Sequence, residues 1–93
     1  MSVTVRIPGP LRKVTNGQDK VEVQCATLDE CINTLEELFP GVKERLMDET
    51  GELRHFVNVY VNGEDVRFMQ GLATPTQTGD EVSIVPAVAG GTI

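Results

Sequence analysis

The chain has 93 residues, 40% of them hydrophobic and 24% charged, as expected for one small domain with little room for a deep enzyme cleft. Eight Lys and Arg against fourteen Asp and Glu give a net charge of −6. This balance argues against a nucleic-acid partner, because phosphate binding requires a basic surface. No apolar run approaches the roughly 20 residues that span a bilayer, and residues 1–10 lack signal-peptide features. We therefore expect no membrane partner and a cytoplasmic location.

Two strands are predicted near the N-terminus. Residues 3–7 alternate apolar and polar side chains, the pattern of a half-buried strand, and Pro8 ends it. Residues 21–25 alternate in the same way after a turn at Asn16-Gly17. The second strand is expected to be antiparallel to the first.

A helix follows. Thr27 and Glu30 form a capping box, in which each side chain binds a backbone N–H at the start of a helix. Apolar residues then recur at helical spacing over residues 28–39, with acidic residues on the other face. Pro40-Gly41 interrupts the pattern, and residues 42–47 predict a further short helical stretch.

The second half of the chain returns to extended structure. Residues 56–61 alternate, and Asn62-Gly63 predicts a hairpin that returns as a short strand through residues 66–68. A last strand is predicted over residues 81–85, and Pro86 ends it because it has no N–H to donate.

The order strand, strand, helix, strand, short strand, strand predicts an α+β fold, because one helix covers only one face of a sheet. The compact solution is a β-grasp (ubiquitin-like) fold, with a mixed sheet of four to five strands and one main helix on one face. Residues 1–86 form the predicted domain. Residues 87–93 form a predicted flexible tail, because they carry no charge, turn motif or periodicity.

The tail contains the most specific chemical signal. Gly90-Gly91 has no Cβ, so its backbone fits a channel too narrow for side chains. Extended, the stretch from Pro86 to Gly91 spans at most roughly 17 Å. Pro86, Ala87, Val88 and Ala89 would then insert into a partner and present Gly91 for activation.

The chain resembles the ubiquitin-like sulfur carriers of the MoaD/ThiS family, and within it the CysO-type carriers of cysteine biosynthesis. The resemblance covers nearly the whole chain. It is most specific in residues 44–48, 56–62, 64–68 and 71–74, and it continues through residues 79–80 and 85–91. The Gly-Gly end is common to the family, whereas the middle segments indicate the CysO type.

The resemblance implies a carrier and not an enzyme. An E1-like enzyme would use ATP and Mg²⁺ to adenylate the Gly91 carboxylate, and sulfur transfer would make a thiocarboxylate. A PLP-dependent cysteine synthase would accept the sulfur, and a JAMM-type zinc peptidase would release cysteine. The carrier itself would bind no cofactor or metal.

The sequence departs from the family pattern at its end. Mature sulfur carriers end at Gly-Gly, but Thr92 and Ile93 follow here. Our hypothesis is that a JAMM-type peptidase trims a precursor after Gly91. The rival interpretations are an added extension, or a homologue that no longer carries sulfur.

Several other residues are candidates for function. Phe56, Tyr60 and Val85 are expected on the open sheet face, where related carriers dock their partners. An equally weighted alternative is that loops partly cover these side chains. Cys25 and Cys31 are expected to be small buried apolar residues, and a disulfide is conceivable if they meet. His55, the single histidine, is expected at the surface or at the edge of a strand.

Alternative functions stay open. The tail is shared with sulfur donors for molybdopterin, thiamine or tungsten-cofactor synthesis. A ubiquitin-like modifier would instead join Gly91 to a lysine through an isopeptide bond. A plain interaction module would keep its function after deletion of residues 90–93.

Overall fold

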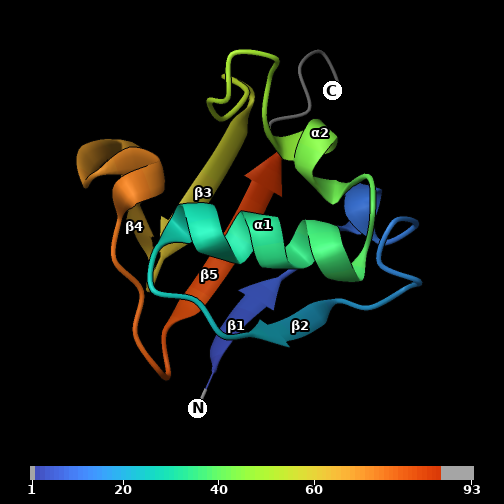
Figure 1. Ribbon diagram of the computed structural model, residues 1–93, viewed down its shortest axis with the longest axis horizontal. Helices are drawn as coiled ribbons and strands as arrows, with labels where there is room; N and C mark the ends of the chain where they lie inside the picture. Colours follow the sequence, from blue (N-terminus) through green and yellow to red (C-terminus); the bar gives the residue numbers. More distant parts are fainter. Residues whose placement is uncertain (1, 87–93) are drawn as a thin grey trace.

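The computed structural model describes residues 2–86, which form one five-stranded mixed sheet with helices on one face (Figure 1). The sheet order is β2-β1-β5-β3-β4. The strands are β1 (Val3–Arg6), β2 (Lys20–Val23), β3 (Val57–Val61), β4 (Glu64–Asp65) and β5 (Glu81–Pro86). The central strands β1 and β5 are parallel, and the other pairs are antiparallel. This is the predicted β-grasp architecture.

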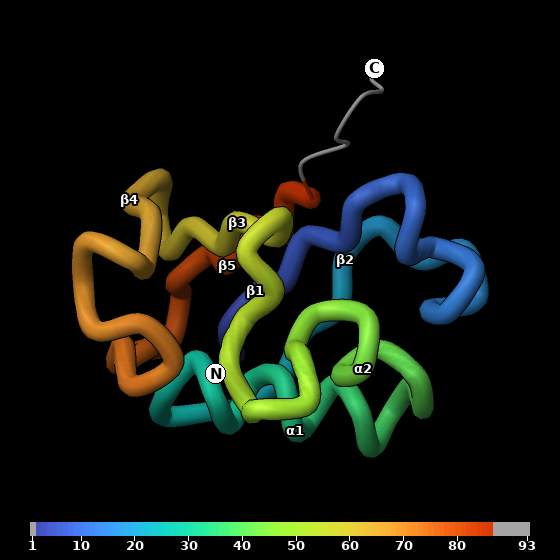
Figure 2. Tube along the Cα trace, turned by 90° about the horizontal axis from the view of Figure 1, so that it is seen from above, coloured from blue at the N-terminus to red at the C-terminus, as the bar shows by residue number. Residues whose placement is uncertain are grey.

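Two α-helices and three short 3-10 helices complete the fold of residues 2–86. They are α1 (Leu28–Leu38), α2 (Val42–Leu46), η1 (Gly9–Leu11), η2 (Val66–Phe68) and η3 (Gly71–Ala73). Figure 2 shows α1 and α2 together on the same side of the sheet. Over residues 2–86 no helix combines the length and the apolar character that crossing a membrane requires.

The main helix begins and ends where the sequence predicts. The Thr27 hydroxyl accepts a hydrogen bond from the Glu30 N–H at 3.3 Å, and the Glu30 carboxylate accepts one from the Ala26 N–H. At the other end, Gly41 has a φ of 106°, a left-handed conformation that favours glycine. The Glu36 carboxylate accepts hydrogen bonds from the backbone of the α1–α2 connection.

The core lies between the sheet and the helices. Val57, Val59 and Val61 face it and are at most 4% exposed, as their alternation predicts. From α1, Leu28 and Leu35 pack against them in the same buried cluster. Each such buried side chain stabilises the fold by about 1.5–3 kcal/mol relative to exposure.

The β3–β4 hairpin is confirmed, but the predicted return strand through residues 66–68 is wrong. Asn62 and Gly63 both have positive φ and form a two-residue turn, with Val61 opposite Glu64. The ladder stops at Asp65, whose carboxylate accepts a hydrogen bond from the Arg67 N–H at 2.8 Å. This cap starts η2 instead of continuing the strand.

Cys25 and Cys31 form a disulfide with their Cα atoms 5.2 Å apart. The disulfide that the sequence left open therefore forms, and neither cysteine is a free apolar residue. Cys31 is buried as predicted, whereas Cys25 is half-buried. The bridge ties the end of the β2–α1 connection to the first turn of α1.

Candidate functional site

β5 carries the chain to the predicted tail. It lies between β1 and β3, and its last residue, Pro86, is the register partner of Val57. A central strand therefore fixes Pro86 at one end of the sheet, and the chain continues from there. The predicted tail residues lie outside the described residues: Ala87, Val88, Ala89, Gly90, Gly91, Thr92 and Ile93.

The three predicted docking residues occupy two neighbouring surfaces. Tyr60 and Val85 alternate with core residues along their strands, so they lie on the sheet face opposite α1. Val85 is 45% exposed and Tyr60 is half-buried. Phe56 precedes β3, is 40% exposed, and stacks edge-on against the exposed His55 with ring centroids 5.7 Å apart. It lines a groove at the end of the sheet.

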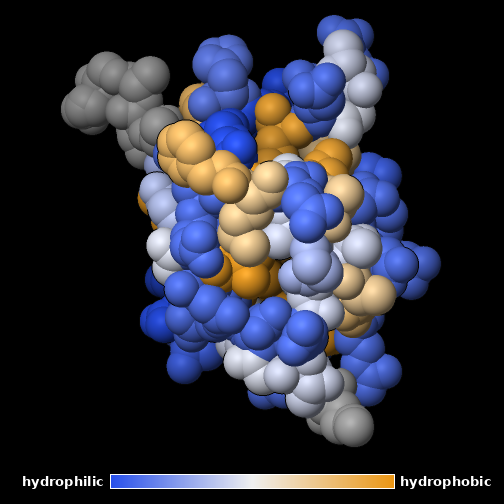
Figure 3. All heavy atoms as spheres, turned by 90° about the vertical axis from the view of Figure 1, so that its left-hand side faces the viewer, coloured by the Kyte–Doolittle hydropathy of each residue, from blue (hydrophilic) through white to orange (hydrophobic). Residues whose placement is uncertain are grey.

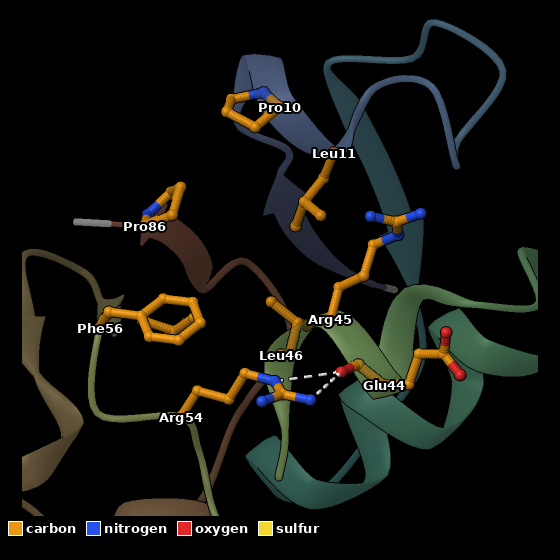
Figure 4. Close-up of a pocket in the computed structure, with 9 residues that line it drawn as sticks. Pro10, Leu11, Glu44, Arg45, Leu46, Arg54, Phe56 and Pro86 are labelled. Carbon is orange, nitrogen blue, oxygen red and sulfur yellow. Dashed lines mark hydrogen bonds between the residues drawn. The ribbon is translucent and has the colours of Figure 1, made fainter. Parts of the chain in front are cut away.

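This groove has a volume of about 510 Å³ and lies beside Pro86. We call it the tail-root groove; its walls are η1, the end of α2 (residues 44–46), the loop before β3 and Pro86. Figure 4 shows Phe56 and Pro86 on one side and Leu11 and Arg45 on the other. Residues 44–48 belong to the segments that carry the family resemblance, and their sequence alone indicates no role.

Arg54 holds the wall of the tail-root groove in place. Its guanidinium donates two hydrogen bonds, of 3.1 and 3.0 Å, to the backbone carbonyl of Glu44 (dashed lines in Figure 4). Its own N–H donates to the carbonyl of Leu46 at 2.9 Å. The loop before β3 is thus fastened to the last turn of α2.

Asp48 organises the turn that brings Arg54 back to α2. Its carboxylate accepts hydrogen bonds from the Thr50 hydroxyl, the Glu52 N–H and the Thr50 N–H. These bonds, with the charge of Arg54, lower the pKa of Asp48 below its usual value. The folded turn therefore stabilises the ionised form of the Asp48 carboxylate.

A second apolar surface is formed by η2 and η3. Phe68 is 89% exposed and Met69 is 38% exposed. The partly buried Leu53 and Leu72 line a hollow together with Arg67 of η2 and Gly71 of η3. Figure 3 shows apolar side chains among hydrophilic ones on this side of the molecule. The sequence pattern missed this surface because it placed Phe68 in a strand.

Within residues 2–86, no three His, Cys, Asp or Glu side chains are grouped closely enough to hold a metal ion. His55 lies at the surface, as predicted. The features beside the strand end that leads to residues 87–93 are an apolar groove and an open sheet face.

Comparison with known proteins supports this description. The ThiS family model matches residues 5–91. The sulfur carrier protein CysO of Mycobacterium tuberculosis is 54% identical over 93 residues, which cover 98% of this chain and all of that protein. The small archaeal modifier protein 3 of Haloferax volcanii is 41% identical over 66 residues, which cover 71% of each chain.

Solved structures agree. A chain of the crystal structure of the Amycolatopsis orientalis BexX/CysO complex superposes with a TM-score of 0.90 and 48% identity, covering 94% of this chain and 97% of that chain. The crystal structure of Mycobacterium tuberculosis CysO matches with a TM-score of 0.88 and 52% identity, covering 92% and 99%. A family model that spans residues 5–91 and relatives of this identity over the full length show that the chain belongs to the ThiS family of ubiquitin-like sulfur carriers.

Proposed function

We propose that this chain is a sulfur carrier for cysteine biosynthesis, and that its working end is Gly91. The observation that carries the proposal is the 54% identity to CysO over the whole length. The fold adds to it, because β5 ends at Pro86 and the sequence continues into Gly90-Gly91. The carrier contributes the acyl group and the docking surfaces, and partner enzymes contribute the catalysis.

The proposed chemistry begins with removal of Thr92 and Ile93 by a JAMM-type zinc peptidase. The Gly91 carboxylate then attacks the α-phosphorus of ATP on an E1-like enzyme with Mg²⁺, and pyrophosphate leaves. A sulfur nucleophile displaces AMP from the acyl-adenylate and leaves a thiocarboxylate. Covalent attachment keeps the sulfide at one site instead of losing it by diffusion.

In the next proposed steps the thiocarboxylate sulfur adds to an aminoacrylate held by a PLP-dependent cysteine synthase. An acyl shift from sulfur to nitrogen gives a carrier–cysteine amide, and hydrolysis by the peptidase releases cysteine. The cofactors in this scheme belong to the partners, and the proposed location is the cytoplasm. Docking is assigned to Phe56, Tyr60 and Val85.

Intact mass measurement tests the proposal. The protein is co-expressed with a JAMM-type peptidase and an E1-like enzyme from the same organism, and we expect loss of Thr92-Ile93 followed by exchange of one oxygen for sulfur. Gly91→Val is the matched control, because its branched side chain obstructs a narrow channel while the body is unchanged. A mass that still includes Thr92 and Ile93, with no exchange of oxygen for sulfur, would contradict the proposal.

A protein-modifier function is the second candidate, favoured by the 41% identity to small archaeal modifier protein 3. Modification would give high-mass adducts that resist reducing agents, since an isopeptide bond joins Gly91 to a lysine. Reaction with thiocarboxylate-selective reagents would instead favour the carrier. Sulfur donation to molybdopterin or thiamine synthesis uses the same tail, and the neighbouring genes distinguish these pathways from cysteine synthesis.

A further inference from the structure

The tail-root groove lies where a partner that receives Gly91 must approach. Gly91 is only five positions after Pro86, so it lies at most roughly 17 Å from Pro86 even when the chain is fully extended. Pro86 itself lines the groove. An enzyme that closes around the Gly91 carboxylate therefore brings its surface against this end of the sheet.

The floor of the groove is apolar and preformed. Leu11, Leu46 and Val57 are buried at its base, and Phe56 remains 40% exposed at its side. The hydrogen bonds of Arg54 to α2 fix the distance between the two walls. A groove that is held open in the free protein accepts an apolar side chain without a large ordering cost.

The rim of the groove is cationic in a chain whose net charge is −6. Arg45 and Arg54 both line it, while the Glu44 carboxylate points away from Phe56 and Pro86 in Figure 4. Arg54 uses its guanidinium on the Glu44 carbonyl. Arg45 is exposed, and its guanidinium has no hydrogen-bond or ion-pair partner among residues 2–86.

We propose that the tail-root groove is the docking site for the adenylating enzyme, which inserts an apolar side chain between Leu11 and Phe56 and pairs a neighbouring carboxylate with Arg45. This inference rests on the proposed function and deepens it. It gives residues 44–48 a role: α2 presents Arg45 beside the point where the tail leaves the sheet. The Arg45 pair selects an acidic partner and speeds its association.

Charge reversal at Arg45 tests the proposal on the carrier trimmed to Gly91, which is the form whose terminal carboxylate the enzyme would adenylate. The probe is the E1-like enzyme of the same organism, assayed by ATP–pyrophosphate exchange with Mg²⁺-ATP. We expect Arg45→Glu to raise the KM for the carrier about tenfold at unchanged kcat, as for loss of an interfacial charge pair. Arg45→Lys, which keeps the charge, should stay within about threefold of the wild type.

Lys20→Glu is the matched control. Lys20 is exposed on the edge strand β2 and does not line the groove, and the substitution makes the same change in net charge. The KM of Lys20→Glu should stay near that of the wild type. The KM of the wild type and of Lys20→Glu should both rise with salt concentration, whereas the KM of Arg45→Glu should not depend on salt. Circular dichroism melts verify that all three variants fold.

The outcomes separate the two proposals. If the wild type exchanges pyrophosphate and Arg45→Glu matches Lys20→Glu in KM and salt dependence, the groove proposal is overturned and the carrier function stands. If the wild type, trimmed to Gly91, supports no exchange, the carrier function is overturned, and the groove proposal falls with it.

Discussion

Asp48 shows how a single exposed carboxylate shapes the site. Its pKa lies below its ordinary value of 3.8, first because of the Thr50 hydroxyl and then because of the Glu52 N–H. A lowered pKa contributes stability above that ordinary value, and the contribution is lost as the pH falls through the folded-state pKa. We therefore predict that acid loosens the 48–52 turn at a pH below 3.8. Titration of the Asp48 carboxyl carbon by NMR checks this.

The same prediction has a mutational form. Asp48→Asn should speed hydrogen exchange at the Thr50 and Glu52 amides, because a neutral amide oxygen is a weaker acceptor than a carboxylate. Glu49→Gln is the control, since the exposed Glu49 carboxylate accepts no hydrogen bond among residues 2–86. Equal exchange rates in the two variants would show that the Asp48 charge does not hold the turn.

At the scale of elements, the disulfide joins the β2–α1 connection to α1. Closing a loop between residues six apart restricts the unfolded chain, so we predict that Cys25→Ser with Cys31→Ser lowers the free energy of unfolding by about 2 kcal/mol. Urea unfolding, followed by circular dichroism, measures the change.

Reduction of the wild type provides a test without mutation. Cys25 lines a surface hollow of about 310 Å³ with Ser2, Gln24 and Thr78, so a small reductant reaches the bridge. Dithiothreitol should shift the urea midpoint of the wild type to that of the double variant and leave the double variant unchanged. An identical midpoint for oxidised and reduced wild type would contradict a stabilising role.

The sequence pattern correctly predicted those turns and helix caps that depend only on residues close to each other in the chain. The Asn62-Gly63 turn and the Thr27 cap depend on neighbours in the sequence, and both form as expected. The disulfide was left open because its geometry depends on a distant segment. The backbone of residues 74–76 binds Ala26 and Leu28 and fixes the start of α1 beside Cys25. The predicted return strand does not form, because the Asp65 carboxylate accepts a hydrogen bond from the Arg67 N–H, which ends the pairing with β3.

At the scale of the whole molecule, the fold was predictable and the groove was not. Alternation and turns determined the element order, and that order left β1 and β5 as central partners. The tail-root groove is assembled from η1, α2, the loop before β3 and Pro86, which are far apart in sequence. A periodic sequence pattern carries no information on contacts between such distant segments. Residues 44–48 were therefore recognisable as a family motif but not as part of a groove.

The division between body and tail gives the last prediction. The described core runs from Val3 to Ile84, and β5 completes its pairing with β3 at Pro86. A chain ending at Pro86 should therefore unfold in urea with a free energy within about 0.5 kcal/mol of the full-length protein. It should also support no pyrophosphate exchange, because it has no Gly91 carboxylate to adenylate.

Gly91→Val in the chain trimmed to residue 91 separates stability from activation, since it keeps the tail and changes only the residue that carries the terminal carboxylate. We expect it to match the truncated chain in lost exchange and the wild type in stability. A loss of more than about 2 kcal/mol on truncation would mean that residues 87–93 pack on the body. The body would then extend beyond Pro86, and a partner would have to detach the tail before Gly91 could enter its active site.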